Sequence, residues 1–180
     1  MGRNSLMKGN NISMYVVRIF CENELLGGGF FLDNQYVITC SHVTDQIKSD
    51  NRSNKINIKP LWPNLSLNNK KSITATLEIS LSDDKYNKIS ERDIAILKID
   101  EKLEIVKPIS LISSNELAGH NFCSLGFPKG HSENGVNTEG KIGYKFADDR
   151  ICIINHKDEI VTLQKGFSGC PLWDESIKGI

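Results

Sequence analysis

Short runs of β-branched and aromatic residues, separated by Gly, Asn, Asp and Pro, dominate the hydrophobic pattern of the chain. Runs of this kind are typical of short strands with tight connections. The stretch at 72–82 alternates apolar and polar residues and therefore predicts a strand buried on one face. Further strands are predicted at 14–21, 28–33, 35–41, 93–100, 121–127, 140–146, 150–156 and 159–165.

Helical periodicity is nearly absent, and only 42–49 and 113–119 are expected to form one or two helical turns. The Asn-, Lys- and Ser-rich stretch at 50–72 is expected to be an exposed loop, and 107–121 to connect two β halves. Many short strands at near-regular spacing predict an all-β protein, an antiparallel sandwich or barrel.

Charge and hydropathy exclude two classes of partner. The 180 residues contain 22 Lys and Arg against 22 Asp and Glu, and this balance argues against nucleic-acid binding. No apolar run reaches the roughly 18–20 residues of a membrane span, so no membrane partner is expected. The N-terminus also lacks the apolar stretch of a secretion signal.

The cysteines indicate a reducing compartment. Their number is odd, none forms a CxxC pair, and a cytoplasmic protein with reduced thiols is the simplest interpretation. Neither Cys40-Ser-His42 nor Cys152-x3-His156 matches a zinc spacing, so no metal and no cofactor are expected.

The segment GFSGCPLW at 166–173 contains a candidate nucleophile, Ser168, although a serine between glycines is also common in ordinary turns. Flanking glycines allow a strained turn that exposes backbone N–H groups. The amides of Gly166 and Ser168 would then form an oxyanion hole beside the hydroxyl.

A serine nucleophile needs a base and a group that orients the base. His42 follows a predicted strand and Asp93 begins another, although a structural histidine and a surface aspartate remain open alternatives. His120 and His131 lie in polar surroundings and are expected to be exposed. The order His42, Asp93, Ser168 is the order of chymotrypsin. An α/β-hydrolase would instead need a histidine after the serine, and none follows it.

Four segments, at 27–43, 92–99, 125–130 and 165–174, resemble motifs of trypsin-like serine peptidases, closest in style to the HtrA-like or cytoplasmic bacterial branch. The resemblance implies two antiparallel six-stranded β-barrels of the chymotrypsin type, at about 14–106 and 121–180. It also implies that the second barrel is truncated at the C-terminus. By the same resemblance His42 is the general base, Asp93 orients it and Ser168 attacks a peptide carbonyl.

The chain departs from the family pattern at Phe167, where secreted relatives have an aspartate, and at Cys170, where they have glycine. Packing of Phe167 or a partner would then have to order the oxyanion loop. The family's specificity position falls on Thr162, and without a carboxylate there a preference for Arg or Lys is not expected.

The sequence therefore predicts a serine endopeptidase that cleaves a protein or peptide substrate. A regulatory partner or a fused C-terminal domain is expected to complete or activate it. The alternatives are an inactive protease-like binding or scaffolding module, and a latent protease that becomes active only with its partner.

Overall fold

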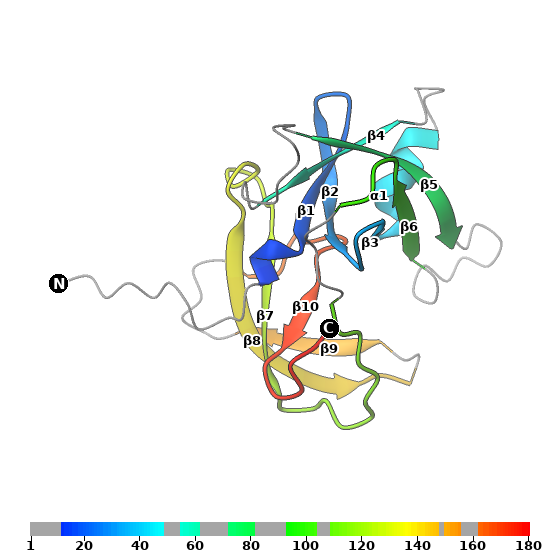
Figure 1. Ribbon diagram of the computed structural model, residues 1–180. Coiled ribbons are helices and arrows are strands. Elements are labelled where there is room, and N and C mark those ends of the chain that lie inside the picture. The colour runs from blue at the N-terminus through cyan, green and yellow to red at the C-terminus, as the bar shows by residue number, and fades with distance from the viewer. Residues whose placement is uncertain are drawn as a thin grey trace.

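Figure 1 shows two β structures next to each other in a computed structural model, which describes residues 12–48, 55–61, 72–81, 93–103, 109–147, 150–155 and 162–180. One is a closed barrel built from the first part of the chain, and the other is a sheet built from the second part. The arrangement confirms the predicted all-β class.

Six antiparallel strands close the barrel in the order β1-β2-β3-β6-β5-β4. Closure pairs both edges of every strand, which removes the unpaired edges that an open sheet exposes. The first barrel is therefore as predicted. Its strands are β1 (Val16–Cys21), β2 (Glu24–Phe31), β3 (Tyr36–Thr39), β4 (Ile56–Pro60), β5 (Ile73–Leu81) and β6 (Ile94–Ile99).

The barrel is filled by the alternate residues of its strands that point inward. Apolar side chains at these positions are fully shielded from water, and their burial is the main force that closes a sheet of this size. The shielded side chains include Val17, Ile19, Phe31, Val37, Ile58 and Leu97.

Helix α1 (Ser41–Lys48) follows β3 directly. Its buried residues Val43, Thr44 and Ile47 are spaced as one helix face, and they pack toward the barrel. The helical turns predicted at 42–49 are thus confirmed. The residues that the structure describes include no helix with the length and apolar character needed to cross a membrane.

The second β structure contains four antiparallel strands in the order β10-β7-β8-β9. In the described residues it is an open sheet, whereas the sequence predicts a six-stranded barrel with its end missing. Its strands are β7 (Asn121–Gly126), β8 (Val136–Lys145), β9 (Ile151–Asn155) and β10 (Leu172–Asp174).

Three local predictions differ from the structure. Residues 162–165 form no strand, and the rest of the strand predicted at 159–165 lies outside the described residues. The segment 113–119 forms no helix but a turn, in which the His120 amide donates to the Leu117 carbonyl at 3.1 Å. Strand β4 lies inside the stretch 50–72, where the sequence predicts a loop. Its short Ile56–Ile58 alternation is surrounded by polar residues and therefore gives only a weak strand signal.

His120 is not as exposed as predicted, whereas His131 is. The Nδ1 atom of His120 lies 2.7 Å from Asp174 Oδ2, and only 25% of the His120 side chain and 4% of the Asp174 side chain are exposed. Asp174 also accepts the Ser176 amide through Oδ1 at 2.7 Å. The pair therefore fastens the start of β7 to the end of β10.

A second apolar cluster joins the sheet to the barrel. Ile12 and Val16 contribute from the N-terminal side, and Cys123, Leu125 and Phe127 contribute from β7 and the residue after it. Because the cluster spans both structures, it holds the loop before β10 against the barrel. Partly buried Leu25, Leu61, Cys170 and Trp173 pack on the same cluster.

Candidate active site

His42 is the second residue of α1, on the side of the helix opposite its buried face. Its side chain is 52% exposed, so the imidazole reaches solvent and remains accessible to a ligand. Because β3 ends one residue before Cys40, the position of the ring depends on the end of that strand. A rigid strand end thus carries the candidate base.

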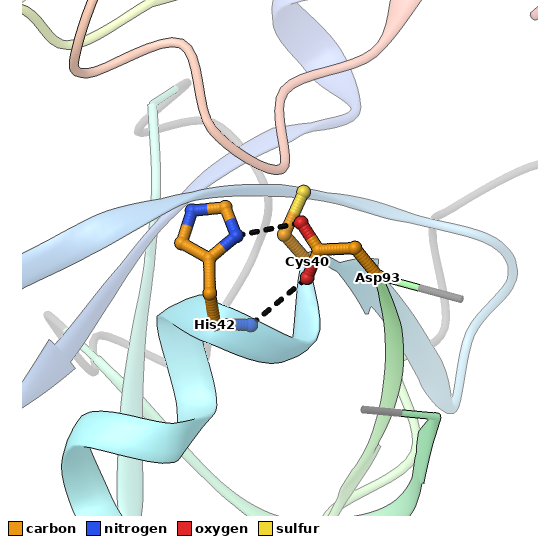
Figure 2. Close-up of side chains that lie close together, drawn as sticks. All are labelled: Cys40, His42 and Asp93. Atoms are coloured by element: carbon orange, nitrogen blue, oxygen red, sulfur yellow. Dashed lines mark hydrogen bonds and ion pairs between the residues drawn. The ribbon is translucent and has the colours of Figure 1, made fainter. Parts of the chain in front are cut away.

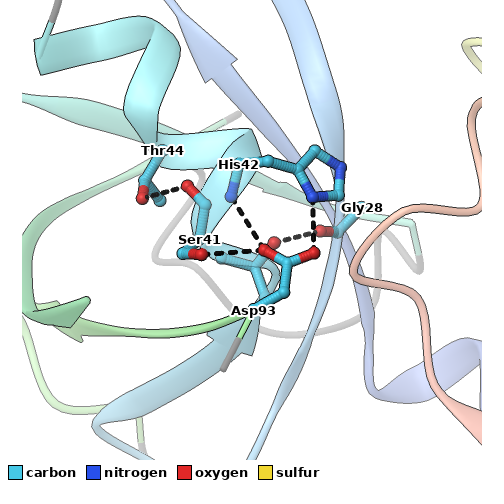
Figure 3. A network of polar contacts seen from close by, with 6 residues as sticks. Gly28, Ser41, His42, Thr44 and Asp93 are labelled. Atoms are coloured by element: carbon cyan, nitrogen blue, oxygen red, sulfur yellow. Dashed lines mark hydrogen bonds and ion pairs between the residues drawn. The ribbon is translucent and has the colours of Figure 1, made fainter. Parts of the chain in front are cut away.

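Asp93 meets α1 because β3 and β6 are antiparallel neighbours. Thr39 pairs with Ala95, and the same register continued by two residues brings Ser41 opposite Asp93. The carboxylate accepts hydrogen bonds at Oδ1 from Ser41 Oγ at 2.8 Å and from the His42 amide at 3.0 Å. Figure 3 shows this network, in which Thr44 Oγ1 also donates to the Ser41 carbonyl at 2.8 Å.

The second oxygen of Asp93, Oδ2, lies 2.6 Å from His42 Nδ1. Burial of the carboxyl opposes its ionisation, but hydrogen bonds from the His42 amide, the Ser41 hydroxyl and the His42 ring outweigh burial and lower the pKa of Asp93. The His42 amide belongs to the first turn of α1, where N–H groups have no partner within the helix. An ionised Asp93 therefore both caps the helix and can accept a hydrogen bond from Nδ1 of the imidazole.

Cys40 lies beside this pair (Figure 2). Its sulfur lies within 4.8 Å of the ligand atoms of His42 and Asp93. Burial and the negative charge of Asp93 together raise the pKa of Cys40 to about 11. The thiol is therefore protonated at neutral pH. Cys40 also borders the turn that contains Ser168, since a Cβ on Gly169 would lie 3.2 Å from the Cys40 amide nitrogen.

The turn that contains Ser168 lies against β2. The Gly28 amide donates to the Ser168 carbonyl at 2.9 Å, and the Gly28 carbonyl in turn accepts Thr39 Oγ1 at 2.7 Å. Because Thr39 ends β3, one chain of hydrogen bonds connects the serine turn to the strand that leads into His42. Within the described residues, however, no hydrogen bond joins the Ser168 hydroxyl to His42.

The two glycines that flank the serine turn cannot be replaced without strain. Gly166 has φ of +109°, and a Cβ there would lie 2.5 Å from Pro128 Cα. Gly169 has φ of +78°, and a Cβ there would lie 2.3 Å from the Gly28 carbonyl oxygen. Both positions require glycine for backbone conformation and for space. In the described part of the chain, neither the Gly166 amide nor the Ser168 amide donates a hydrogen bond.

Phe167, which stands where secreted relatives have aspartate, is buried with 8% exposure. Its ring lies so close to Gly126 that a Cβ on that residue would meet it at 2.4 Å. The Phe167 amide also donates to the Gln164 carbonyl at 3.1 Å, and the Gly166 carbonyl accepts the Phe127 amide at 2.8 Å. This ring therefore packs on the end of β7, which is the contact that one of the two explanations of loop ordering from the sequence requires.

We predict that Gly28→Ala lowers the free energy of unfolding by about 1–3 kcal/mol, as overpacked sites do. A Cβ at this position would lie 2.1 Å from the Cys170 sulfur, whereas its next contacts, with the Phe127 ring at 3.5 Å, are ordinary. The clash is thus with one sulfur atom, and adding Cys170→Ala should restore most of the lost free energy of unfolding. Urea unfolding of the two single variants and the double variant measures this coupling.

Gly29→Ala is the matched control for that cycle. Its Cβ would meet the Ile38 carbonyl oxygen at 2.8 Å, a backbone atom that Cys170→Ala does not move. Rescue of Gly29→Ala by Cys170→Ala, or failure to rescue Gly28→Ala, would contradict the contact between β2 and the serine turn.

Sequence reasoning identifies His42 and Asp93, which the structure brings together, and Ser168, whose turn contacts Gly28 and Cys40. Thr162, the predicted specificity residue, is exposed at the start of the last described segment. Sequence reasoning missed Ser41 as a partner of Asp93. The only signal for it was a hydroxyl next to the histidine.

A closed six-stranded barrel beside a second antiparallel sheet is the arrangement of serine proteases with the chymotrypsin fold, and this chain has that fold. It belongs to the trypsin-like peptidase domain family, whose profile matches residues 27–178. The match includes the segments of His42, Asp93 and Ser168, so the family assignment rests on both halves of the molecule.

Several solved protease structures are similar to this chain. The Rv3671c protease in its inactive form superposes with a TM-score of 0.61 at 20% identity, over 93% of this chain and 76% of that chain. A serine-to-alanine mutant of Rv3671c from M. tuberculosis H37Rv, also inactive, gives 0.62 at 18% identity, over 95% and 76%. Neuropsin, a serine protease from mouse brain, gives 0.61 at 18% identity, over 91% and 78%. At these identities the likeness shows a shared fold alone, and no curated protein sequence matched.

Proposed function

We propose that this chain is a serine endopeptidase that hydrolyses peptide bonds of a protein substrate through His42, Asp93 and Ser168. The observation that carries the proposal is the contact of 2.6 Å between His42 Nδ1 and Asp93 Oδ2. Asp93 accepts a hydrogen bond from Nδ1–H, so the lone pair of the neutral imidazole lies on Nε2, the nitrogen that a nucleophile needs as its base.

In the proposed reaction His42 Nε2 removes the Ser168 hydroxyl proton while Oγ bonds to the peptide carbonyl carbon. The amides of Gly166 and Ser168 stabilise the negative charge that develops on the carbonyl oxygen. The imidazolium then gives its proton to the leaving amine as the C–N bond breaks. Water, activated by the same imidazole, releases the acyl group and regenerates the serine.

Substrate choice belongs to the same proposal. Thr162 offers a hydroxyl and no negative charge, so we expect no preference for Arg or Lys at the cleaved bond. Five cysteines without a disulfide in the described residues are consistent with work in a reducing, cytoplasmic compartment, most simply that of a bacterium.

A latent protease is the second candidate, since no hydrogen bond joins Ser168 to His42 in the part of the chain that the structure describes. Catalytic hydrogen bonds of free enzymes are often long and tighten only when substrate binds. A regulatory partner or a fused C-terminal domain would supply the same ordering in a latent enzyme. A protease-like binding module would never form the hydrogen bond between Ser168 and His42.

We predict that a fluorophosphonate probe labels the full-length chain at one serine, and that peptide mass spectrometry locates the adduct on Ser168. Only a deprotonated, oriented hydroxyl reacts with this phosphorus centre, so unfolded protein serves as the unreactive control. An adduct on another serine would refute the assignment of the nucleophile. Labelling that needs an added partner would favour the latent protease, and no labelling under any condition would favour the binding module.

A further inference from the structure

Three side chains at the site could together bind a metal ion, a property that peptide hydrolysis does not use. Cys40, His42 and Asp93 each offer a ligand atom, and these three atoms lie within 4.8 Å of one another (Figure 2). Thiolate, imidazole and carboxylate are the three ligand types that proteins use for zinc. The sequence spacing of Cys40 and His42 gives no zinc motif, because the third ligand, Asp93, comes from a distant segment, directly before β6.

The surroundings of the cluster already orient its ligand atoms. Asp93 Oδ1 is occupied by Ser41 Oγ and the His42 amide, which leaves Oδ2 to face the ring. Second-sphere hydrogen bonds of this kind orient the ligands of protein metal sites. Cys40 is held beside the serine turn, where a Cβ on Gly169 would lie 3.2 Å from the Cys40 amide nitrogen.

The dimensions of the cluster suit a small tetrahedral cation. Zinc bonds of about 2.0–2.3 Å separate neighbouring ligand atoms by roughly 3.3–3.8 Å. The 2.6 Å contact of His42 Nδ1 with Asp93 Oδ2 therefore has to open by about 1 Å. His42 and Asp93 are 52% and 30% exposed, so both side chains have room for this change.

Charge also favours a divalent cation. Without a metal the Cys40 thiol is protonated, and when a cation binds it loses this proton, so that thiolate and carboxylate together carry two negative charges. A zinc ion neutralises both, and its fourth position stays open to water because the cluster provides three protein ligands.

We infer that Cys40, His42 and Asp93 form a zinc site that switches this protease off. Zinc would take His42 Nδ1 and Asp93 Oδ2, and the proton of the Cys40 thiol would pass to solvent. The imidazole proton moves from Nδ1 to Nε2, so Nε2 no longer has a lone pair for the Ser168 proton. The proposed zinc binding depends only on the geometry of the cluster, whereas the proposed inhibition also depends on the proposed peptidase function.

Cobalt titration of the full chain, kept reduced with a phosphine, tests the binding without any measurement of activity. Tetrahedral Co²⁺ on a thiolate gives a sulfur-to-cobalt charge-transfer band, which zinc should abolish by displacing the cobalt. Cys40→Ser should lose the band and bind zinc about 100-fold more weakly or worse, since the loss of a ligand exceeds the 10–100-fold cost of an outer partner.

Cys170→Ala is the matched control, because Cys40 lies close enough to Cys170 to raise the pKa of that second thiol, yet Cys170 does not belong to the cluster. This variant should keep the cobalt band and the zinc affinity. Ser168→Ala should keep both too, and so separates binding from catalysis. A missing band in the unsubstituted chain, or an undiminished band in Cys40→Ser, would overturn the zinc site.

The inhibition is measured on the peptidase itself. Zinc should stop hydrolysis, and a chelator should restore it. With each rate normalised to the metal-free rate of the same variant, Cys40→Ser should need about 100-fold more zinc for half inhibition. Equal zinc sensitivity of Cys40→Ser and the unsubstituted chain would refute the switch. If the chain hydrolyses nothing, the proposed function fails, and the cobalt spectrum still decides the metal site.

Discussion

Ser168→Ala is expected to lower kcat/KM for peptide hydrolysis by about 10⁶-fold, the loss that a serine protease suffers without its nucleophile. Alanine removes only the Oγ atom, which makes no hydrogen bond within the described residues. The contact of the Ser168 carbonyl with the Gly28 amide is unaffected. The variant should therefore fold with the stability of the unsubstituted chain, and hydrolysis of a fluorogenic peptide library together with thermal unfolding checks both parts.

Ser132→Ala is the control for Ser168→Ala, because Ser132 is an exposed serine in the turn before β8. It should retain full activity and full reaction with the fluorophosphonate probe. A Ser168→Ala variant that keeps more than a hundredth of the activity would show that another group is the nucleophile. A variant that loses activity only because it unfolds would appear as a lowered melting temperature.

Much of the fold could be predicted because the strands carry local signals. Strand β5 alternates from Ile73 onward, and β6 is an apolar run that begins after Asp93. Strand β4 gives only a short alternation at Ile56–Ile58, and its pairing with β1 and β5 is decided by barrel closure rather than by its own five residues. The four-stranded second sheet depends in the same way on pairings between distant segments, such as β7 with β10.

The candidate site was predictable to the extent that short motifs carry it. His42, Asp93 and Ser168 each lie in a segment that resembles a family motif, and their order along the chain agrees with one known arrangement. The roles of Cys40 and Ser41 were not predictable, because both depend on the register of β3 against β6. A shift of that register by one residue would turn a different side chain toward Asp93.

Asp93→Asn is expected to lower kcat by about 10⁴-fold with little change in KM, because it changes the base and not the surface that binds substrate. Asp93 accepts hydrogen bonds at both oxygens, whereas an asparagine presents one acceptor oxygen and an NH2 group that can only donate. The oxygen should stay with Ser41 and the His42 amide, which leaves the N–H group facing His42 Nδ1. Nδ1 then has to accept, and the ring proton moves to Nε2.

The tautomer itself provides the decisive measurement for Asp93→Asn. Nitrogen-15 NMR of the imidazole should find the proton on Nδ1 in the unsubstituted chain and on Nε2 in the variant. Ser41→Ala is the matched control, since it removes one hydrogen bond to Asp93 but keeps the negative charge and the tautomer. Its loss of kcat should be far smaller than that of Asp93→Asn. Equal losses in the two variants, or an Asp93→Asn variant that keeps its proton on Nδ1, would mean that Asp93 supports the start of α1 and does not set the protonation of His42.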